Sequence, residues 1–141
     1  MISFEQALSE LLSLAKQLES EMASIEDASG RILASDAIAT HNQPPFDASA
    51  MDGYALQKSD KLPNKKLSVI GRVAAGGSFD GSVNKNQAVR IFTGAPLPAG
   101  ADSVLIQEDG EVNEDNIVIN DNIEANDYIR KKGDDYKKGE V

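Results

Sequence analysis

Apolar residues recur at helical spacing over the first part of the chain. They step by four and three residues through Phe4, Leu8, Leu11, Ala15, Leu18 and Met22, which is the pattern of an amphipathic helix. Ser3 and Gln6 form a capping-box pattern at its start. The pattern therefore predicts a helix over residues 4–22, one stripe of which must pack against another part of the protein.

A second, shorter helical signal covers residues 27–33. Asp27 suits the cap position, whereas Gly30 weakens the signal because glycine is a poor helix former. Over residues 40–45 we expect an extended, loop-like chain, because two consecutive prolines push the residues before them out of the helical region.

Beyond Phe46 the sequence changes to short β-rich runs separated by turn residues. The runs cover residues 67–73, 88–92, 103–107 and 117–119, and turns are expected at Asn64, Gly76-Gly77, Gly81 and residues 113–116. This change of period predicts an α+β protein in two parts. We expect a small β-rich domain over residues 46–124 and an N-terminal helical arm over residues 1–45, to which residues 125–141 return.

Length and composition agree with one ordinary domain plus an arm. The chain has 141 residues and 40% apolar content, which is enough for a core. It lacks a basic start followed by an apolar run, and no eighteen apolar residues stand together, so we expect a soluble, cytoplasmic protein without a membrane segment. With no cysteine and one histidine, His41, the sequence excludes a thiolate nucleophile and cysteine- or histidine-based metal sites.

The charge of the chain is negative and unevenly placed. The formal net charge is −9, and nine acidic residues lie between Arg90 and Arg130 with no lysine or arginine among them. Such a field repels nucleic acid, which is therefore not an expected partner. Any small anionic ligand would meet the same repulsion, so its cationic contacts are expected to come from elsewhere.

Residues 44–55, PPFDASAMDGYA, form the first of two loops that stand out chemically. Asp52-Gly53 predicts a tight turn in which the glycine takes a positive φ. Asp47, Ser49 and Asp52 fall within six positions, so this first loop could hold carboxylates and a hydroxyl rigidly beside a ligand. The alternative is a simple connector whose aspartates accept hydrogen bonds from their own turn.

The second loop is RIFTGAPLPAGAD, residues 90–102, which follows an expected strand. Thr93 would lie at the mouth of that strand, and the N–H groups of Gly94 and Ala95 are candidates for contacts with phosphate or an oxyanion. The alternative is a proline-shaped turn between strands. The stretch AAGGSFDG fits neither a P-loop nor a dinucleotide fingerprint and is interpreted as a turn. From these residues alone, binding and catalysis both stay open.

Six stretches of the chain are more specific together than either loop is alone. They are GRILASD (30–36), PPFDASAMDGYA (44–55), VAAGG (73–77), RIFTGAPLPAGAD (90–102), IQED (106–109) and IRKKGDDYKKGEV (129–141). In this order they resemble the MoeA family of molybdopterin molybdenumtransferases, which includes the E domain of gephyrin. The resemblance covers most of the chain, and the first loop together with TGAPLP is its most specific part.

Departures from the family pattern are small. Ala48 replaces the usual asparagine, Phe92 replaces the methionine before TGA, and Gly133-Asp134-Asp135 stands where the family commonly has Gly-Glu-Asp. Family members continue with a MogA-like domain that binds molybdate and nucleotide, and with a C-terminal β domain. The resemblance therefore implies the MoeA N-terminal and linker domains only, as the front portion of a longer protein.

The resemblance also implies a function for that longer protein. It takes molybdate and adenylylated molybdopterin as substrates and leaves molybdenum on the pterin dithiolene with release of AMP, in a magnesium-dependent reaction. Its cleft lies between the subunits of a homodimer, and contact with the preceding adenylyltransferase is also expected. The MogA-like domain of the dimer partner would then supply the lysines and arginines that this chain lacks.

By the same resemblance, the functional residues are Asp52, Thr93 and Asp135. We expect Asp52 to ligate Mg²⁺ or to orient the attacking water. Thr93 is expected to donate a hydrogen bond to phosphate or an oxyanion, because the sequence shows no base in reach that could make it a nucleophile. Asp135 either braces the loop between arm and β-rich domain or acts directly. Substrate contacts are expected at Ser49, Gly94 and Ala95.

Two other functions stay open. One is a non-catalytic pterin-binding or scaffold module of the same fold. The other is an unrelated small β adaptor, which requires the six stretches to be coincidental. On its own, the chain is expected to be inactive and to bind neither molybdate nor AMP appreciably, because its charge is adverse.

Overall fold

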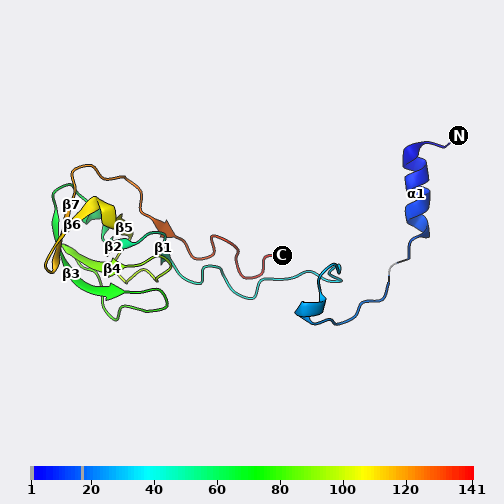
Figure 1. Cartoon of the computed structure of the whole chain (residues 1–141), viewed down its shortest axis with the longest axis horizontal. Coiled ribbons are helices and arrows are strands. Elements are labelled where there is room, and N and C mark those ends of the chain that lie inside the picture. The colour runs from blue at the N-terminus through cyan, green and yellow to red at the C-terminus, as the bar shows by residue number, and fades with distance from the viewer. Residues whose placement is uncertain (1, 17) are drawn as a thin grey trace. The chain divides into compact units, whose positions relative to one another are not determined.

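The computed structural model describes residues 2–16 and 18–141 (Figure 1). Contacts between residues divide the chain into two units, residues 1–37 and 38–141. This division falls ahead of the expected boundary at residue 45, and the domain assignment stays a prediction. None of the helices in the described ranges has both the length and the apolar character needed to cross a bilayer.

The first unit contains one α-helix, α1 (Phe4–Leu14). Ser3 caps it as predicted, because its hydroxyl accepts a hydrogen bond from the backbone N of Gln6 at 3.2 Å. The predicted extension to Met22 is wrong, since Ala15 is already extended with φ −72° and ψ 128°; residue 17 of the predicted helix lies outside the described residues. No side chain of α1 is buried, so its apolar stripe is uncovered within this unit.

The predicted second helix is also wrong. A single 3-10 turn, η1 (Ile25–Asp27), lies at its expected start, and residues 28–37 form no helix. Gly30 accounts for the difference, because its φ of 78° is incompatible with a right-handed helix. Arg31 folds back instead, and its Nε donates to the carbonyl oxygen of Asp27 at 3.1 Å.

The second unit is built around a mixed six-stranded sheet with the order β5-β2-β4-β3-β7-β6. Strands β3 and β4 are parallel, and all other neighbours are antiparallel. The strands are β2 (Gly53–Leu56), β3 (Lys66–Val73), β4 (Gln87–Ile91), β5 (Ser103–Ile106), β6 (Gly110–Asn113) and β7 (Asn116–Ile119), with 3-10 turns η2 (Lys58–Asp60) and η3 (Gln107–Asp109). The β-rich domain predicted from the sequence is therefore confirmed.

Strands β3, β4, β5 and β7 lie within one residue of the predicted runs at either end, whereas β2 and β6 are additional. All four residues of β2 are buried, so the strand shows no alternation of apolar and polar positions. Successive residues of β2 enter opposite cores: Tyr54 and Leu56 belong to one buried cluster and Ala55 to the other. Packed side chains thus cover both faces of β2, and this packing fixes the positions of its ends.

A two-stranded sheet lies beside the larger one. Strand β1 (Ala48–Ser49) pairs antiparallel with β8 (Ile129–Arg130). The chain before β1 and the chain after β8 continue alongside each other (Figure 1). The backbone N of Gln43 donates to the carbonyl oxygen of Tyr136 at 2.9 Å. The C-terminal residues therefore hold the entry of the first loop.

Candidate functional site

Pairing of β2 with β4 joins the two loops that the sequence singles out. The strands are antiparallel with Gly53 opposite Ile91, so the residues before β2 lie next to the residues after β4. The backbone N of Ser49 donates to the carbonyl oxygen of Ala95 at 3.0 Å, and the N of Gly94 donates to the carbonyl oxygen of Ser49 at 2.9 Å. The first and second loops therefore form one continuous site.

Asp52 and Thr93 form the centre of this site. The backbone N and the hydroxyl of Thr93 both donate to Oδ1 of Asp52, each at 2.8 Å. The backbone N of Gln107 donates to the carbonyl oxygen of Asp52 at 3.1 Å, which fixes the main chain that carries the carboxylate. Within the described residues, no hydrogen bond uses the Oδ2 atom of Asp52. A carboxylate oxygen is therefore left available beside an exposed threonine.

Hydrogen bonds from Thr93 keep the Asp52 carboxylate ionised. The bond from the Thr93 backbone N lowers the pKa of Asp52 most, followed by the bond from its hydroxyl; slight burial raises that pKa, and attraction to Arg90 lowers it. The expectation that no base lies within reach of Thr93 is corrected here, because Asp52 contacts the hydroxyl directly. The lowered pKa nevertheless makes Asp52 a weak base and favours the binding of a cation or a water molecule.

Gly53 serves a different purpose from the predicted one. The sequence predicts a tight turn with positive φ at this glycine, but Gly53 is the first residue of β2. A Cβ atom at this position would lie 2.0 Å from the carbonyl oxygen of Leu105, on the neighbouring strand β5. Glycine therefore permits the close approach of β2 and β5, and in this way it fixes the position of Asp52.

The three predicted substrate contacts are engaged within the protein. Ser49 is fully buried, and its hydroxyl donates to the carbonyl oxygen of Met51 at 2.6 Å. The N–H of Gly94 is bonded to Ser49, and the N–H of Ala95 donates to the carbonyl oxygen of Phe92 at 2.9 Å. The bond from Gly94 joins the two loops, whereas the other two bonds each lie within one loop. The role of these groups in substrate binding stays a prediction, and it would require these bonds to open.

Two further aspartates connect the first loop region to the C-terminal segment. Asp47 accepts hydrogen bonds at 2.9 Å from Nζ of Lys131 and from the backbone N of Lys132, and these bonds lower the pKa of Asp47. Asp135 forms an ion pair with Arg130. In the described part of the chain, no hydrogen bond or ion pair links Asp135 to the Asp52–Thr93 pair. This placement favours a bracing role for Asp135, and a direct role stays a prediction.

Sequence reasoning missed the residues that surround the central pair. Arg90 donates to the carbonyl oxygen of Gly53 at 3.1 Å and to Oε1 of Gln107 at 2.6 Å, so it ties β4 to β2 and to η3. Arg72 and Phe92 lie beside it. The position of Arg90 at the head of the second loop is the available signal for it, whereas no motif marks Arg72.

A magnesium ion would find one protein ligand at this site. In residues 2–16 and 18–141, no three histidine, aspartate or glutamate side chains gather in a way that could hold a metal ion. Mg²⁺ usually takes one or two carboxylates and completes its shell with water and substrate phosphate oxygens. Asp52 therefore fits a magnesium ion shared with a substrate, but it does not form a complete site.

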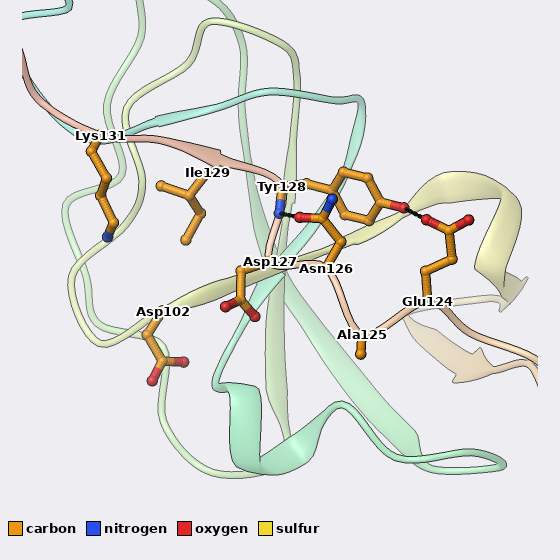
Figure 2. A pocket seen from close by; sticks show the side chains of 8 residues that line it. All are labelled: Asp102, Glu124, Ala125, Asn126, Asp127, Tyr128, Ile129 and Lys131. Atoms are coloured by element: carbon orange, nitrogen blue, oxygen red, sulfur yellow. Dashed lines mark hydrogen bonds between the residues drawn. The ribbon is translucent and has the colours of Figure 1, made fainter. Parts of the chain in front are cut away.

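A separate pocket opens around residues 124–131 (Figure 2). Its volume is about 550 Å³, and its polar groups are largely paired. Figure 2 shows the Tyr128 hydroxyl donating to Glu124, and Asp127 forms an ion pair with Lys58 at 2.7 Å. The lining residues are Asp102, Glu124, Ala125, Asn126, Asp127, Tyr128, Ile129 and Lys131, which do not include the Asp52–Thr93 pair.

Comparison with known proteins finds relatives over the whole chain. The family described as "MoeA N-terminal region (domain I and II)" matches residues 2–141. The molybdopterin molybdenumtransferase of Haemophilus influenzae is 41% identical over 143 residues, which cover 100% of this chain and 35% of that protein. The enzyme of the same name from Bacillus subtilis is 36% identical over 112 residues, which cover 76% of this chain and 26% of that protein.

A solved structure is also similar over the full length of the chain. The crystal structure of a molybdopterin biosynthesis MoeA protein from Pyrococcus horikoshii OT3 matches with a TM-score of 0.88 and 33% identity, covering 100% of this chain and 39% of that chain. This chain therefore spans no more than 39% of the length of any of these three relatives.

Proposed function

This chain belongs to the family of MoeA N-terminal regions, and on that premise we propose that it is the front portion of a molybdopterin molybdenumtransferase. The full-length protein would transfer molybdenum from molybdate to adenylylated molybdopterin and release AMP. The names of the relatives from Haemophilus influenzae and Bacillus subtilis support this assignment. The non-catalytic pterin-binding or scaffold module remains the second candidate, because it would have the same fold.

The observation that carries the proposal is the Asp52–Thr93 pair. Two loops that are far apart in the sequence meet there, and a charged carboxylate oxygen is left available beside an exposed hydroxyl. A carboxylate that only stabilised a turn would accept hydrogen bonds from its own loop. Asp52 instead accepts them from Thr93, 41 residues away, so its side chain is positioned by the meeting of two strand ends.

In the proposed reaction, Asp52 orients the water that attacks the adenylate. The water oxygen bonds to the phosphorus of the AMP group, the bond from that phosphorus to the molybdopterin oxygen breaks, and a proton from water ends on the departing oxygen. The low pKa of Asp52 keeps it charged, so it can align water or hold Mg²⁺ through Oδ2. Magnesium, when bound, stabilises the charge that develops on the phosphate oxygens.

Thr93 is proposed to hold the carboxylate in place. Its hydroxyl proton is directed to Asp52, so its remaining lone pairs face outward as acceptors. A role as donor to an oxyanion therefore requires the hydroxyl to rotate away from Asp52 when substrate binds. The same proposal includes Asp135 as the residue that orients Arg130 near the end of the first loop.

Partners and location belong to the same proposal. We propose a homodimer with the cleft shared between subunits, because the net charge of −9 leaves this chain poor in cations for anionic substrates. Contact with the adenylyltransferase and a cytoplasmic location follow from the family resemblance. Residues 1–45 with 125–141 are proposed as an arm, which the bonds between the segments around Gln43 and Tyr136 support.

The proposal is tested by molybdenum insertion in the full-length protein. Asp52→Asn and Thr93→Ala should each lower the rate of insertion about 10²-fold or more, the usual loss when an orienting carboxylate or an oxyanion donor is removed. Thr40→Ala is the matched control, because Thr40 is the only other threonine and contacts His41 instead. Thermal unfolding midpoints measured alongside should stay near the wild-type value for all three variants.

The same measurement separates the two candidate functions. Asparagine keeps an oxygen that can accept both bonds from Thr93, so the loop geometry should survive in Asp52→Asn. A full-length wild-type protein without molybdenum insertion would favour the scaffold module, whereas insertion at the wild-type rate in Asp52→Asn would assign Asp52 to loop structure. Inactivity with a large drop in the unfolding midpoint would lead to the same conclusion.

A further inference from the structure

A row of cationic and aromatic residues crosses three strands of the sheet, although the chain as a whole is acidic. Tyr54 of β2 lies opposite Arg90 of β4, and Arg90 lies opposite Arg72 of β3. Residues directly opposite one another share a face of the sheet. Phe92 follows Arg90 by two residues and lies on that face as well. We call these four residues the arginine row.

The two guanidinium groups in the arginine row share one aromatic ring. Cζ of Arg72 lies 4.9 Å from the centre of the Phe92 ring, and Cζ of Arg90 lies 4.8 Å from the same centre. Arg90 is also 5.0 Å from the centre of the Tyr54 ring. Such distances allow cation–π attraction. Both guanidinium groups therefore lie close to aromatic rings, of which Tyr54 is buried and Phe92 half-buried.

Among the described residues, no carboxylate is in ion-pair contact with the arginine row, although Asp52 attracts Arg90 from a longer distance. Within the ranges that the structure describes, neither Arg72 nor Arg90 forms an ion pair. The two acceptors that Arg90 uses, Gly53 O and Gln107 Oε1, are neutral. No hydrogen bond among the described residues uses the donors of Arg72. Like charges directly opposite each other across strands repel.

The arginine row adjoins the candidate site. Phe92 is the residue before Thr93, and Arg90 bonds to the carbonyl oxygen of the residue after Asp52. A ligand group that bridged the two guanidinium groups would therefore have its neighbouring atoms next to the Asp52–Thr93 pair. A tetrahedral dianion suits this position, because guanidinium donors match the spacing of phosphate oxygens.

We propose that Arg72 and Arg90, whose guanidinium groups both lie against the Phe92 ring, form a phosphate-binding subsite beside the Asp52–Thr93 pair. The identity of that phosphate as part of adenylylated molybdopterin rests on the proposed function, whereas the binding of phosphate itself does not. In this subsite, the chain itself would bind one anionic group of the ligand. Cationic residues of a partner domain would then be needed only for the other anionic groups.

The test is an NMR titration of this chain with inorganic phosphate at constant ionic strength, followed at the Nε–H groups of Arg72 and Arg90 and at the amide of Thr93. We expect saturable shifts at these groups with a millimolar dissociation constant, because the nearby Asp52 charge and the net charge of −9 oppose binding. Arg72→Gln should weaken phosphate binding about tenfold or more, as expected for the loss of one charge-assisted contact. Arg72 is exposed, so its replacement leaves the core intact.

Three further variants sharpen the result. Lys66→Gln removes the same charge from the exposed far end of the same strand, β3, and should leave the dissociation constant within about twofold, since the distance exceeds the screening length. Asp52→Asn removes the opposing charge beside the subsite and should tighten phosphate binding, whereas Asp115→Asn, in the turn between β6 and β7, should not.

The proposal is overturned if Lys66→Gln weakens binding as much as Arg72→Gln, if the shifts do not saturate, or if molybdate binds more tightly than phosphate. Failure of the proposed function is distinguishable from these outcomes. A full-length protein without molybdenum insertion would contradict the enzyme assignment, and a chain whose Arg72 still binds phosphate would keep the subsite.

Discussion

Replacement of Gly53 by asparagine separates two reasons for a glycine beside the candidate site. A glycine that supplies a positive φ can often be replaced by asparagine, which tolerates the left-handed region better than other residues. A glycine that permits close approach cannot, because every side chain adds a Cβ atom. At Gly53 that atom would lie 2.0 Å from the carbonyl oxygen and 2.9 Å from the carbonyl carbon of Leu105. We therefore expect Gly53→Asn to be strongly destabilising.

The size of the effect follows from the geometry of β2 and β5. Carbon–oxygen contacts between strands are about 3.3 Å or longer, so the strands must separate by roughly 1.3 Å at this end. Overpacking of this kind costs about 1–3 kcal/mol. The ladder pairs Gly53 with Ile106, and each backbone hydrogen bond lost there costs about 1 kcal/mol more. The free energy of unfolding should fall by about 3 kcal/mol.

Urea unfolding followed by far-ultraviolet circular dichroism measures this change. Gly76→Asn is the matched control, because Gly76 has a positive φ of 78° and no atom within 4 Å of an added Cβ. Its free energy of unfolding should change by less than about 1 kcal/mol. If Gly53→Asn falls within the same range as Gly76→Asn, close approach is not the reason for this glycine. The amide signal of Thr93 reports at the same time whether Asp52 has moved.

Three further outcomes are expected. Asp60 is buried, and burial raises the pKa of Asp60, but hydrogen bonds from Lys65 and from the backbone N of Asn86 outweigh burial and lower it overall. The stability that a lowered carboxyl pKa contributes is present above about pH 4 and is lost as the pH falls. The free energy of unfolding in urea should therefore decrease between about pH 5 and 3, and it should decrease less in Asp60→Asn. An equal pH dependence in the two proteins would contradict this prediction. The hydrogen bond to Glu124 raises the pKa of Tyr128 to about 12. In an absorbance titration, Glu124→Gln should therefore lower the pKa of the tyrosine that ionises last toward about 10. An unchanged titration curve would contradict the contact between Tyr128 and Glu124. Calorimetry should detect no micromolar binding of molybdate or AMP to this chain, and micromolar affinity for either would mean that the site is complete here.

Short β-rich runs predicted strands β3, β4, β5 and β7, whereas β2 and β6 were missed. Strand β3 alternates along most of its length, and its run was predicted within one residue. Strand β2 is buried throughout, and it begins with Gly53, which the sequence analysis assigns to a turn. Strand β6 is mostly exposed and polar, so it lacks an apolar signal. Burial on both faces does not by itself hide a strand, because β4 and β5 also contribute to both buried clusters and were predicted from their valine, leucine and isoleucine residues.

The start of α1 was predicted correctly, whereas its end was predicted wrongly. The Ser3 cap is a local interaction over three residues, so the sequence specifies it fully. Continuation past Leu14 depends on burial of the apolar stripe, and in this unit no side chain of α1 is buried. Most helical stability in proteins comes from such packing and not from intrinsic propensity. Periodicity predicts which face should be buried, but it cannot supply the surface that buries it.

Both members of the central pair were marked by their loops, yet their contact is a tertiary property. Asp52 precedes β2 and Thr93 follows β4, and their contact results from the antiparallel register that sets Gly53 opposite Ile91. Because β2 itself was not predicted, no argument from spacing could bring the two residues together. The family resemblance assigned both to one site, and the strand register gives the physical reason.

Net charge alone does not describe the surface at the same place. A formal charge of −9 is a sum over the whole chain, and its long-range field is screened over about 8–10 Å at physiological salt. A ligand in contact with the sheet experiences mainly the groups within that distance, and there Arg72 and Arg90 lie opposite each other without a carboxylate in ion-pair contact among the described residues. The absence of cations from residues 91–129 is therefore compatible with a cationic position at the residue just before that stretch. Charge counted along the sequence describes the approach of a ligand, whereas strand register determines what the ligand meets on arrival.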